Sequence, residues 1–298
     1  MLVSNQTRMS CLREKIMIAP EIKFGLDIGH GSSYGPEELA ALKECLCNMA
    51  PSHGKKVLEF ESKFAAYCGT KYASAVTSAT TGLTLAGIAV GVDKGDEVIT
   101  TPISWVATAF VFSQLGAKIV FCDVDPYTLC LDPSKLEALI TKKTKAIVPV
   151  HLYGQCCEMD KIMAIAQRHG VPVIEDCAHN PGGSYKGIKS GALGNIGVFS
   201  FHQQKNMCTL GEGGMVTTND CTFYERVFSF RSLCCRNYGK SDKYLPIDEK
   251  YPMGKSYWKL MFDDIGYNFR MTDAQGAVGI EQLKKLDGNN AKRICLST

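Results

Sequence analysis

A lysine and an aspartate have the residue types and the sequence surroundings from which group-transfer chemistry can be built. Lys205 follows a short apolar run and precedes the glycine-rich run 211–214, while Asp176 lies 29 positions earlier (205 − 176 = 29), directly after another apolar run. A lysine amine can hold a carbonyl cofactor as a Schiff base, and an aspartate can keep a pyridinium nitrogen protonated. These residues suggest pyridoxal phosphate (PLP), with Lys205 as its covalent attachment and Asp176 as the partner of its ring nitrogen.

Two ring-bearing side chains near these positions each allow two interpretations. Trp105, in the run 102–108, could stack on a pyridine ring, or it could be an ordinary core tryptophan. His179, three positions after Asp176, could hydrogen-bond a ring hydroxyl of the cofactor, or it could cap a turn. The residues alone leave both alternatives open.

The run from Ser78 to Leu83 is rich in hydroxyl groups and lies between a strand-like run and a helical pattern. Its amides and hydroxyls would surround a helix N-terminus, where unpaired N–H groups and a partial positive charge favour an anion such as a cofactor phosphate. Hydroxyl-rich turns of this kind are also common helix caps. The run by itself is compatible with either role.

The composition is that of a folded globular protein. Of 298 residues, 45% are hydrophobic and 21% charged, and the length allows one large domain and part of a second. The net charge is +3 and no basic run occurs, so neither nucleic acid nor an anionic membrane is indicated as a partner. Two long uncharged stretches, 72–92 and 98–117, contain hydroxyls, Pro102 and Gln114, which favour a buried α/β core over membrane spans.

The fourteen cysteines are scattered along the chain, without the CxxC spacing or the matched histidines of a zinc site. We therefore expect no metal. The N-terminal residues lack the apolar stretch of a secretory signal. Reduced thiols and a cytoplasmic location are the expectation.

Short apolar runs alternate with helical patterns through most of the chain. This alternation predicts a mainly parallel sheet with helices on both faces, and it places the candidate residues at strand ends and in the loops that follow. The expected strands are 73–76, 97–100, 119–122, 146–150, 171–175 and 196–201, and the expected helices are 36–49, 57–67, 81–90, 107–115, 133–140, 161–169 and 272–286. We expect an N-terminal arm at 1–35, a large PLP-binding domain at 36–230, and at 231–298 a long polar and aromatic loop and the start of a second domain.

The ordered combination of these segments resembles the DegT/DnrJ family of sugar aminotransferases, within the fold-type I aspartate aminotransferase superfamily. The resemblance runs from about Pro36 to Leu286, and besides the segments described above it includes Gly95–Ile99, Val120–Asp125, Val150–Gly154, Tyr185–Gly187 and Gly266–Met271. It implies an α/β fold with a mainly parallel seven-stranded sheet flanked by helices. Relatives continue well beyond the helix that contains Leu286, so the small C-terminal domain is expected to be incomplete here.

The resemblance also assigns roles around the cofactor. Lys205 is implied as Schiff-base lysine and proton shuttle, Asp176 as partner of the pyridinium nitrogen, His179 as neighbour of the ring hydroxyl and Trp105 as the stacking residue. The phosphate positions correspond to Thr80, Thr81, Ser200 and, from a neighbouring subunit, Asn268. A homodimer with shared sites is therefore implied.

These assignments lead to an expected activity. We expect a PLP-dependent aminotransferase that moves an amino group from glutamate or glutamine to a keto sugar, with a nucleotide-linked sugar favoured. Family members that are sugar 3-dehydratases place histidine at the lysine position, so retention of Lys205 favours transamination. The alternatives are a cyclitol aminotransferase acting on a keto-inositol, and a shortened, non-catalytic PLP-binding or subunit-interaction protein.

Overall fold

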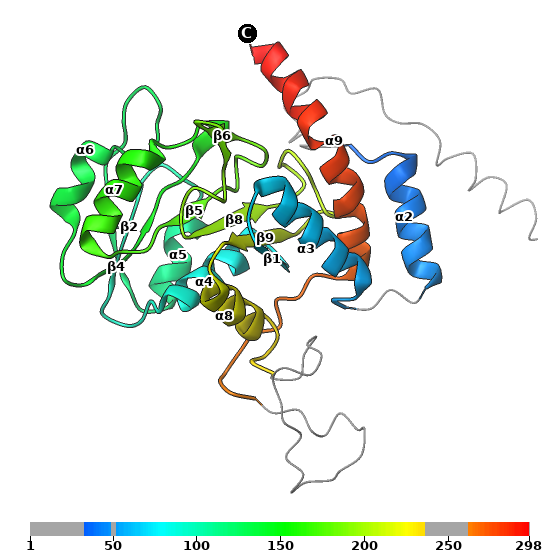
Figure 1. The fold of residues 1–298 in the computed structure, drawn as a ribbon, viewed down its shortest axis with the longest axis horizontal. Helices are drawn as coiled ribbons and strands as arrows, with labels where there is room; N and C mark the ends of the chain where they lie inside the picture. Colours follow the sequence, from blue (N-terminus) through cyan, green and yellow to red (C-terminus); the bar gives the residue numbers. More distant parts are fainter. Residues whose placement is uncertain (1–32, 49–51, 236–261, 298) are drawn as a thin grey trace, which may run out of the picture.

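Two hydrogen-bonded ladders of strands lie at the centre of the molecule (Figure 1). The computed structural model describes residues 33–48, 52–235 and 262–297. The strands of the two ladders are β1 (Tyr72–Val76), β2 (Glu97–Thr100), β3 (Lys118–Phe121), β4 (Thr144–Val148), β5 (Ile174–Asp176), β8 (Ile196–Ser200) and β9 (Gly214–Thr218). The order is β1-β9-β8-β5 in one ladder and β3-β2-β4 in the other, while β6 (Ser184–Tyr185) and β7 (Ile188–Lys189) form a separate hairpin.

The two ladders adjoin along β4 and β5. Isolated parallel bridges join Ile147 to Val173 and Val150 to Asp176. Among the strands of the two ladders, β9 runs antiparallel to both of its neighbours, and the other pairs are parallel. The predicted α/β class with a mainly parallel sheet is confirmed. One seven-stranded sheet is not confirmed as such, because the ladders contain four and three strands.

Alternate side chains of the strands are buried on opposite faces of the sheet, as expected for a strand covered on both sides. In β8, Val198 packs in the cluster that includes Leu83 of α4 (Ala79–Val90), together with residues of α5 (Ala107–Gln114) and α8 (Cys221–Arg231). The next residue, Phe199, packs with Phe64 of α3 (Lys55–Cys68), their ring centroids 5.0 Å apart. Different helices therefore cover the two faces.

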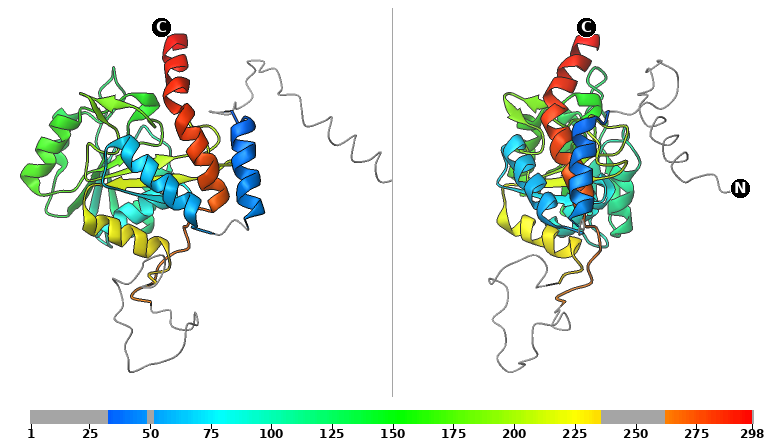
Figure 2. Two further views of the ribbon diagram at one scale, coloured as in Figure 1. Left: turned by 45° about the vertical axis from the view of Figure 1, so that its right-hand side comes forward. Right: turned by 90° about the vertical axis from the view of Figure 1, so that its right-hand side faces the viewer.

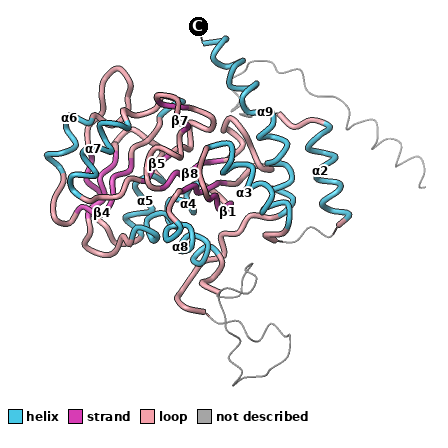
Figure 3. Tube along the Cα trace, in the orientation of Figure 1, coloured by secondary structure: helices cyan, strands magenta, loops and turns pink. Residues whose placement is uncertain are grey.

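Two groups of helices lie toward opposite ends of the sheet (Figures 2 and 3). At one end, α2 (Pro36–Cys47), α3 and α9 (Asp273–Ser297) lie side by side, and Glu38 accepts hydrogen bonds from Lys285 at 2.7 Å and from Gln282 at 2.8 Å. At the other end lie α6 (Pro133–Leu136) and α7 (Met159–His169). The short 3-10 segments are η1 (Glu137–Leu139) and η2 (Leu152–Gly154). The last turns of α9 extend beyond the rest of the described chain (Figure 2).

Several element predictions need correction. β9 and α8 were not predicted, and the helix expected to end at Leu286 continues to Ser297. From residue 287 onward the side chains of this helix are half-buried or exposed, so no apolar face continues there to signal helix. Most of the loop expected from Arg231 to Asp264 lies outside the described residues, as does most of the expected N-terminal arm.

The two uncharged stretches form strand and helix, as predicted. Residues 72–92 contain β1 and α4, and residues 98–117 contain most of β2 and all of α5. No helix in the part of the chain that the structure describes is both long and apolar enough to cross a membrane.

Candidate active site

A cavity of about 770 Å³ lies beyond the ends of the parallel strands, where ligands bind in open α/β sheets. The segments that follow β1, β2, β4, β5 and β8 all contribute to its lining. The structure thus brings together six of the candidate residues from widely separated parts of the sequence: Thr80, Trp105, Asp176, His179, Ser200 and Lys205.

Asp176 is the last residue of β5, and its carboxylate is buried and held at both oxygens. Oδ2 accepts the hydroxyl of Thr108 at 2.8 Å, and Oδ1 accepts the N–H of Ala178 at 3.0 Å. The Thr108 hydroxyl in turn lies 2.8 Å from that of Ser104. Two fixed donors orient this carboxylate before any ligand binds, and each oxygen keeps a lone pair for a further donor.

Lys205 lies in the loop between β8 and β9 and is half-buried. Its backbone N–H donates to the carbonyl of His202 at 2.8 Å, which tightens the loop. Burial lowers the pKa of the Lys205 amine from its ordinary value, while the negative charge of Asp176 opposes this shift. A lowered pKa increases the neutral fraction of the amine, and the neutral form is the nucleophile that attacks a carbonyl.

The N-terminus of α4 reaches the cavity through Ser78 and Thr80. Ser78 caps the helix by accepting the N–H of Thr81 at 3.2 Å, and the Thr81 hydroxyl donates back to the carbonyl of Ser78 at 2.8 Å. Thr81 does not line the cavity, so the structure assigns its hydroxyl to the cap, while Thr80 and Ser200 face the space that an anion would occupy.

Trp105 and His179 can now be placed. Trp105 is 71% exposed and lines the cavity, so the core-tryptophan alternative is wrong. His179 also lines the cavity, and its ring stacks on Tyr153 with centroids 5.5 Å apart and planes 7° from parallel. Burial and the positive charge of Lys205 lower the pKa of His179, while Asp176 acts in the opposite direction. The described residues show no turn capped by its side chain.

Asn268 does not reach this cavity. Its side chain is exposed, and its backbone forms an isolated antiparallel bridge with Ser232. This placement leaves the Asn268 side chain available to another molecule, which is the situation that the expected subunit-shared site requires.

Thr108 and Tyr153 are the site residues that the sequence-based interpretation missed. Thr108 is a buried hydroxyl in the otherwise apolar first turns of α5, and an isolated polar residue in such a helix is a usable signal. Tyr153 lies in the Val150–Gly154 motif, but no residue pattern indicates that its ring would contact His179.

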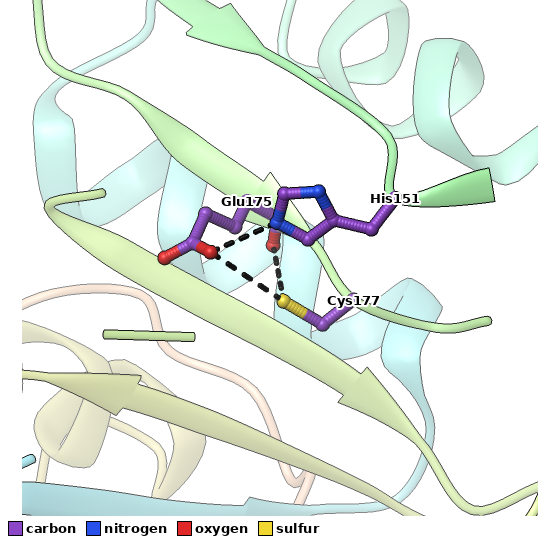
Figure 4. Close-up of side chains that lie close together, drawn as sticks. All are labelled: His151, Glu175 and Cys177. Atoms are coloured by element: carbon purple, nitrogen blue, oxygen red, sulfur yellow. Dashed lines mark hydrogen bonds and ion pairs between the residues drawn. The ribbon is translucent and has the colours of Figure 1, made fainter. Parts of the chain in front are cut away.

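His151, Glu175 and Cys177 form a buried group behind the site whose ligand-type atoms lie within 4.8 Å of one another (Figure 4). His151 Nδ1 accepts the N–H of Cys157 at 3.2 Å, so Nε2 carries the ring proton and donates to Glu175 at 2.9 Å. The Glu175 carboxylate also accepts the backbone N–H groups of Gly191, Leu193 and Gly194. Both ring nitrogens are engaged, so this group is a satisfied hydrogen-bond network that fixes β5 rather than a metal site.

An aspartate at the end of β5 and a lysine in the loop after the adjacent parallel strand β8 line one cavity with the N-terminus of α4, and this arrangement defines the class of fold-type I PLP transferases. The chain belongs to the DegT/DnrJ/EryC1/StrS aminotransferase family, whose sequence model matches residues 32–297. The resemblance and the fold class inferred from the sequence are confirmed.

Three relatives illustrate the match. GDP-perosamine synthase of Caulobacter vibrioides is 43% identical over 242 residues, which cover 81% of this chain and 60% of that protein. The aminotransferase structure from Psychrobacter cryohalolentis has a TM-score of 0.77 at 38% identity, covering 85% of this chain and 62% of that one. NtdA from Bacillus subtilis, solved with bound cofactor PMP, has a TM-score of 0.72 at 29% identity, covering 84% and 52%. The chain therefore spans less than two thirds of the length of each of these relatives.

The family and the PMP-bound neighbour imply PLP as the cofactor, and the residues of the cavity fit that group. A half-buried amine, an oriented carboxylate, an exposed indole and a helix N-terminus face one space. In addition, His179 Nδ1 is buried without a hydrogen-bond partner among the described residues, as expected for an atom that hydrogen-bonds a ligand.

Proposed function

We propose that this chain is a PLP-dependent aminotransferase that transfers an amino group from glutamate or glutamine to a nucleotide-linked keto sugar. The observation that carries the proposal is the convergence of Lys205 and Asp176 on one cavity in a chain of this family. The sugar substrate is supported by the name of the relative from Caulobacter vibrioides, GDP-perosamine synthase.

Each residue of the site has a task that its position allows. When bound, PLP supplies an electron sink for a substrate carbanion. Asp176, oriented by Thr108, holds a proton on the ring nitrogen, and the indole of Trp105 can cover the ring. Thr80 and Ser200 bind the phosphate beside the N-terminus of α4.

Lys205 holds the cofactor and, once released, moves a proton at the substrate carbon that carries the amino group. Its pKa is lowered by burial, which keeps part of the amine neutral and able to accept that proton. A general base must lie within hydrogen-bond reach of the atom it serves. Lys205 lines the same cavity as Asp176, and its backbone N–H is bonded to the carbonyl of His202, so it meets this condition better than a free surface lysine.

The proposal includes a homodimer in which Asn268 of one subunit completes the phosphate site of the other. Beside the cavity, Ile103, Val106 and Phe110 expose 41%, 44% and 57% of their surface around the start of α5. An apolar group of this kind suits burial against a second copy. A cytoplasmic location is also part of the proposal, since the cysteines that the structure describes are free thiols.

The test follows the amino group through both half-reactions. The PLP-loaded chain is mixed with glutamate or glutamine, and the conversion of the cofactor to its pyridoxamine form is followed by absorbance. A panel of nucleotide-linked keto sugars and a keto-inositol is then screened for reversal. Reversal by a nucleotide-linked sugar is expected, reversal by keto-inositol alone would indicate the cyclitol enzyme, and PLP binding without turnover of any ketone would indicate a non-catalytic PLP-binding protein.

Lys205→Ala is the control for the covalent role of the lysine. Borohydride treatment of the PLP-loaded wild-type chain should fix the cofactor to it, as seen by a mass increase, and the variant should show no such increase and no turnover. Near-normal transamination by the variant would contradict the assignment of Lys205.

A further inference from the structure

The segment that follows β4 has no role in the assignments above, although it lies against the site. Val150 forms a parallel bridge with Asp176, and the backbone N–H of His151 donates to the carbonyl of Asp176 at 3.0 Å. The buried His151 side chain is fixed by Glu175, as described above. The chain is therefore anchored firmly at His151, two residues before Tyr153.

Tyr153 is held in an uncommon conformation at the edge of the cavity. Its backbone has φ 51° and ψ 28°, in the left-handed region that large side chains rarely adopt. Its side chain is exposed, and it lines the cavity. Such conformations persist where the surroundings enforce them, and they concentrate at functional sites. With Leu152 buried on one side and Gly154 at φ 90° on the other, this turn directs the Tyr153 ring onto His179.

The His179 imidazole depends on this contact for its orientation. Its side chain makes no hydrogen bond to any of the described residues, and Nδ1 is buried without a partner. The Tyr153 ring, nearly parallel at 5.5 Å, is the ring contact that defines the imidazole plane. Aromatic pairs in offset stacks restrain each other without the directionality of a hydrogen bond.

We propose that Tyr153 is a positioning residue that fixes the plane of the His179 imidazole, so that one ring nitrogen meets the cofactor ring at a set angle. The cofactor contact rests on the proposed function, whereas the stack exists independently of any ligand. Misalignment of this one hydrogen bond should weaken PLP binding roughly 3- to 10-fold, which corresponds to about 0.65–1.4 kcal/mol.

The first experiment uses the full chain without cofactor. NMR of ¹⁵N-histidine-labelled protein, with the His179 signals assigned from a His179→Gln variant, gives the pKa of that imidazole. Burial contributes to its lowered pKa, so Tyr153→Ala should raise the pKa toward its ordinary value, while Tyr153→Phe, which keeps the ring, should match the wild type. An unchanged His179 titration in Tyr153→Ala would overturn the positioning role.

The second experiment titrates PLP into the same variants and records its dissociation constant and the pH dependence of its absorbance. Tyr153→Ala should bind 3- to 10-fold more weakly with an altered pH profile, and Tyr153→Phe should not. Tyr153→Gly, which removes the ring but suits the left-handed backbone, should bind as weakly as the alanine variant without a lower melting temperature. Failure of the wild-type chain to bind PLP would overturn the proposed function and the cofactor contact with it. Wild-type affinity and pH profile in both ring-deleted variants would overturn the positioning role alone.

Discussion

The carboxylate of Asp176 shows how strongly single residues of this site depend on neighbours that are distant in sequence. Thr108, 68 positions earlier, donates a 2.8 Å hydrogen bond to it, and the N–H of Ala178 holds the other oxygen. A buried carboxylate with fixed donors keeps one orientation. A further donor that binds its remaining lone pairs is therefore held at a defined position. Thr108 therefore orients the Asp176 carboxylate, which we propose as the partner of the ring nitrogen.

Replacing Thr108 by valine should weaken this arrangement. The shape is nearly unchanged but the donor is lost, which leaves Asp176 Oδ2 short of a partner and should lower the free energy of unfolding by about 1–3 kcal/mol. PLP binding should weaken as well. Urea unfolding and absorbance titration measure the two effects, and Thr108→Ser is the matched control that retains the hydroxyl. A valine variant equal to the serine variant in both measurements would show that this hydrogen bond has no such role.

Lys205 and Asp176 could be proposed from the sequence because each lies in a local run whose residue types are typical of this chemistry. The contacts of Thr108 and Tyr153 could not, because they join segments whose proximity is decided only by the order of strands in the sheet. Thr81 illustrates a second limit. Its residue type suits a phosphate site, whereas the cap bond of its hydroxyl to the carbonyl of Ser78 is visible only in the structure.

At the scale of elements, the middle of α3 and the end of α8 are joined by a buried group of charges. Arg231 is fully buried and donates to Glu61 at 2.5 Å and to the carbonyl of Ala75 at 2.7 Å, and one of its nitrogens lies 3.3 Å from His53 Nε2. Burial, and the positive charges of Arg231 and Arg270, lower the pKa of His53 to about 3. This helix junction should therefore respond to acid.

The lowered pKa of His53 makes the stability of the chain depend on pH. His53 has a lower pKa in the folded chain than in the unfolded chain, so the unfolded chain takes up the proton first and the free energy of unfolding falls as pH decreases from about 6.5 toward 3. His53→Gln should show a shallower fall over this window. Denaturant unfolding at a series of pH values measures it, and parallel curves for the two proteins would contradict the assigned shift.

Close packing of α9 on α3 depends on a glycine. A Cβ added at Gly276 would lie 2.9 Å from the backbone nitrogen of Val57, whereas one added at Gly288 in the same helix would meet nothing within 4 Å. The backbone of α3 cannot move aside as a flexible side chain could. The separation of these two helices therefore depends on the absence of a side chain at Gly276.

Gly276→Ala and Gly288→Ala should have opposite effects on stability. The first forces the helices apart and should lower the free energy of unfolding by about 1–3 kcal/mol. The second gains helix propensity without a clash and should raise it by about 0.5–1 kcal/mol. Chemical denaturation of both variants provides the comparison, and a destabilised Gly288→Ala or an unaffected Gly276→Ala would contradict this account of the packing.

The elements themselves were predicted unevenly, for physical reasons. The parallel strands are continuous apolar runs, so their positions were found closely. β9 was missed because it begins with a glycine and ends with threonines, between a glycine-rich loop and Asn219. α8 was missed although Phe223, Val227 and Phe230 recur at helical spacing and pack on one core cluster.

At the scale of the whole molecule, the proposed dimer can be tested by combining two defective chains. Each proposed shared site takes Lys205 from one subunit and Asn268 from the other. A mixed dimer of a Lys205→Ala chain and an Asn268→Ala chain should therefore contain one site without either substitution and recover part of the wild-type turnover. The Asn268→Ala chain must first prove substantially impaired by itself. Mass measurement verifies the mixed dimer, and a verified dimer without recovered turnover, or an active monomer, would contradict the shared site.

The position of β1 in the sheet has a consequence for how the chain is made. β1 pairs in the ladder only with β9, and Gly214, where β9 begins, comes 138 positions after the end of β1 at Val76 (214 − 76 = 138). On the ribosome, β1 emerges long before its partner exists, while β2, β3 and β4 are synthesised close together and can pair early. β1, which leads to the proposed phosphate site, therefore pairs with its neighbouring strand late in synthesis. During synthesis, an apolar edge of this kind is where a chaperone would bind.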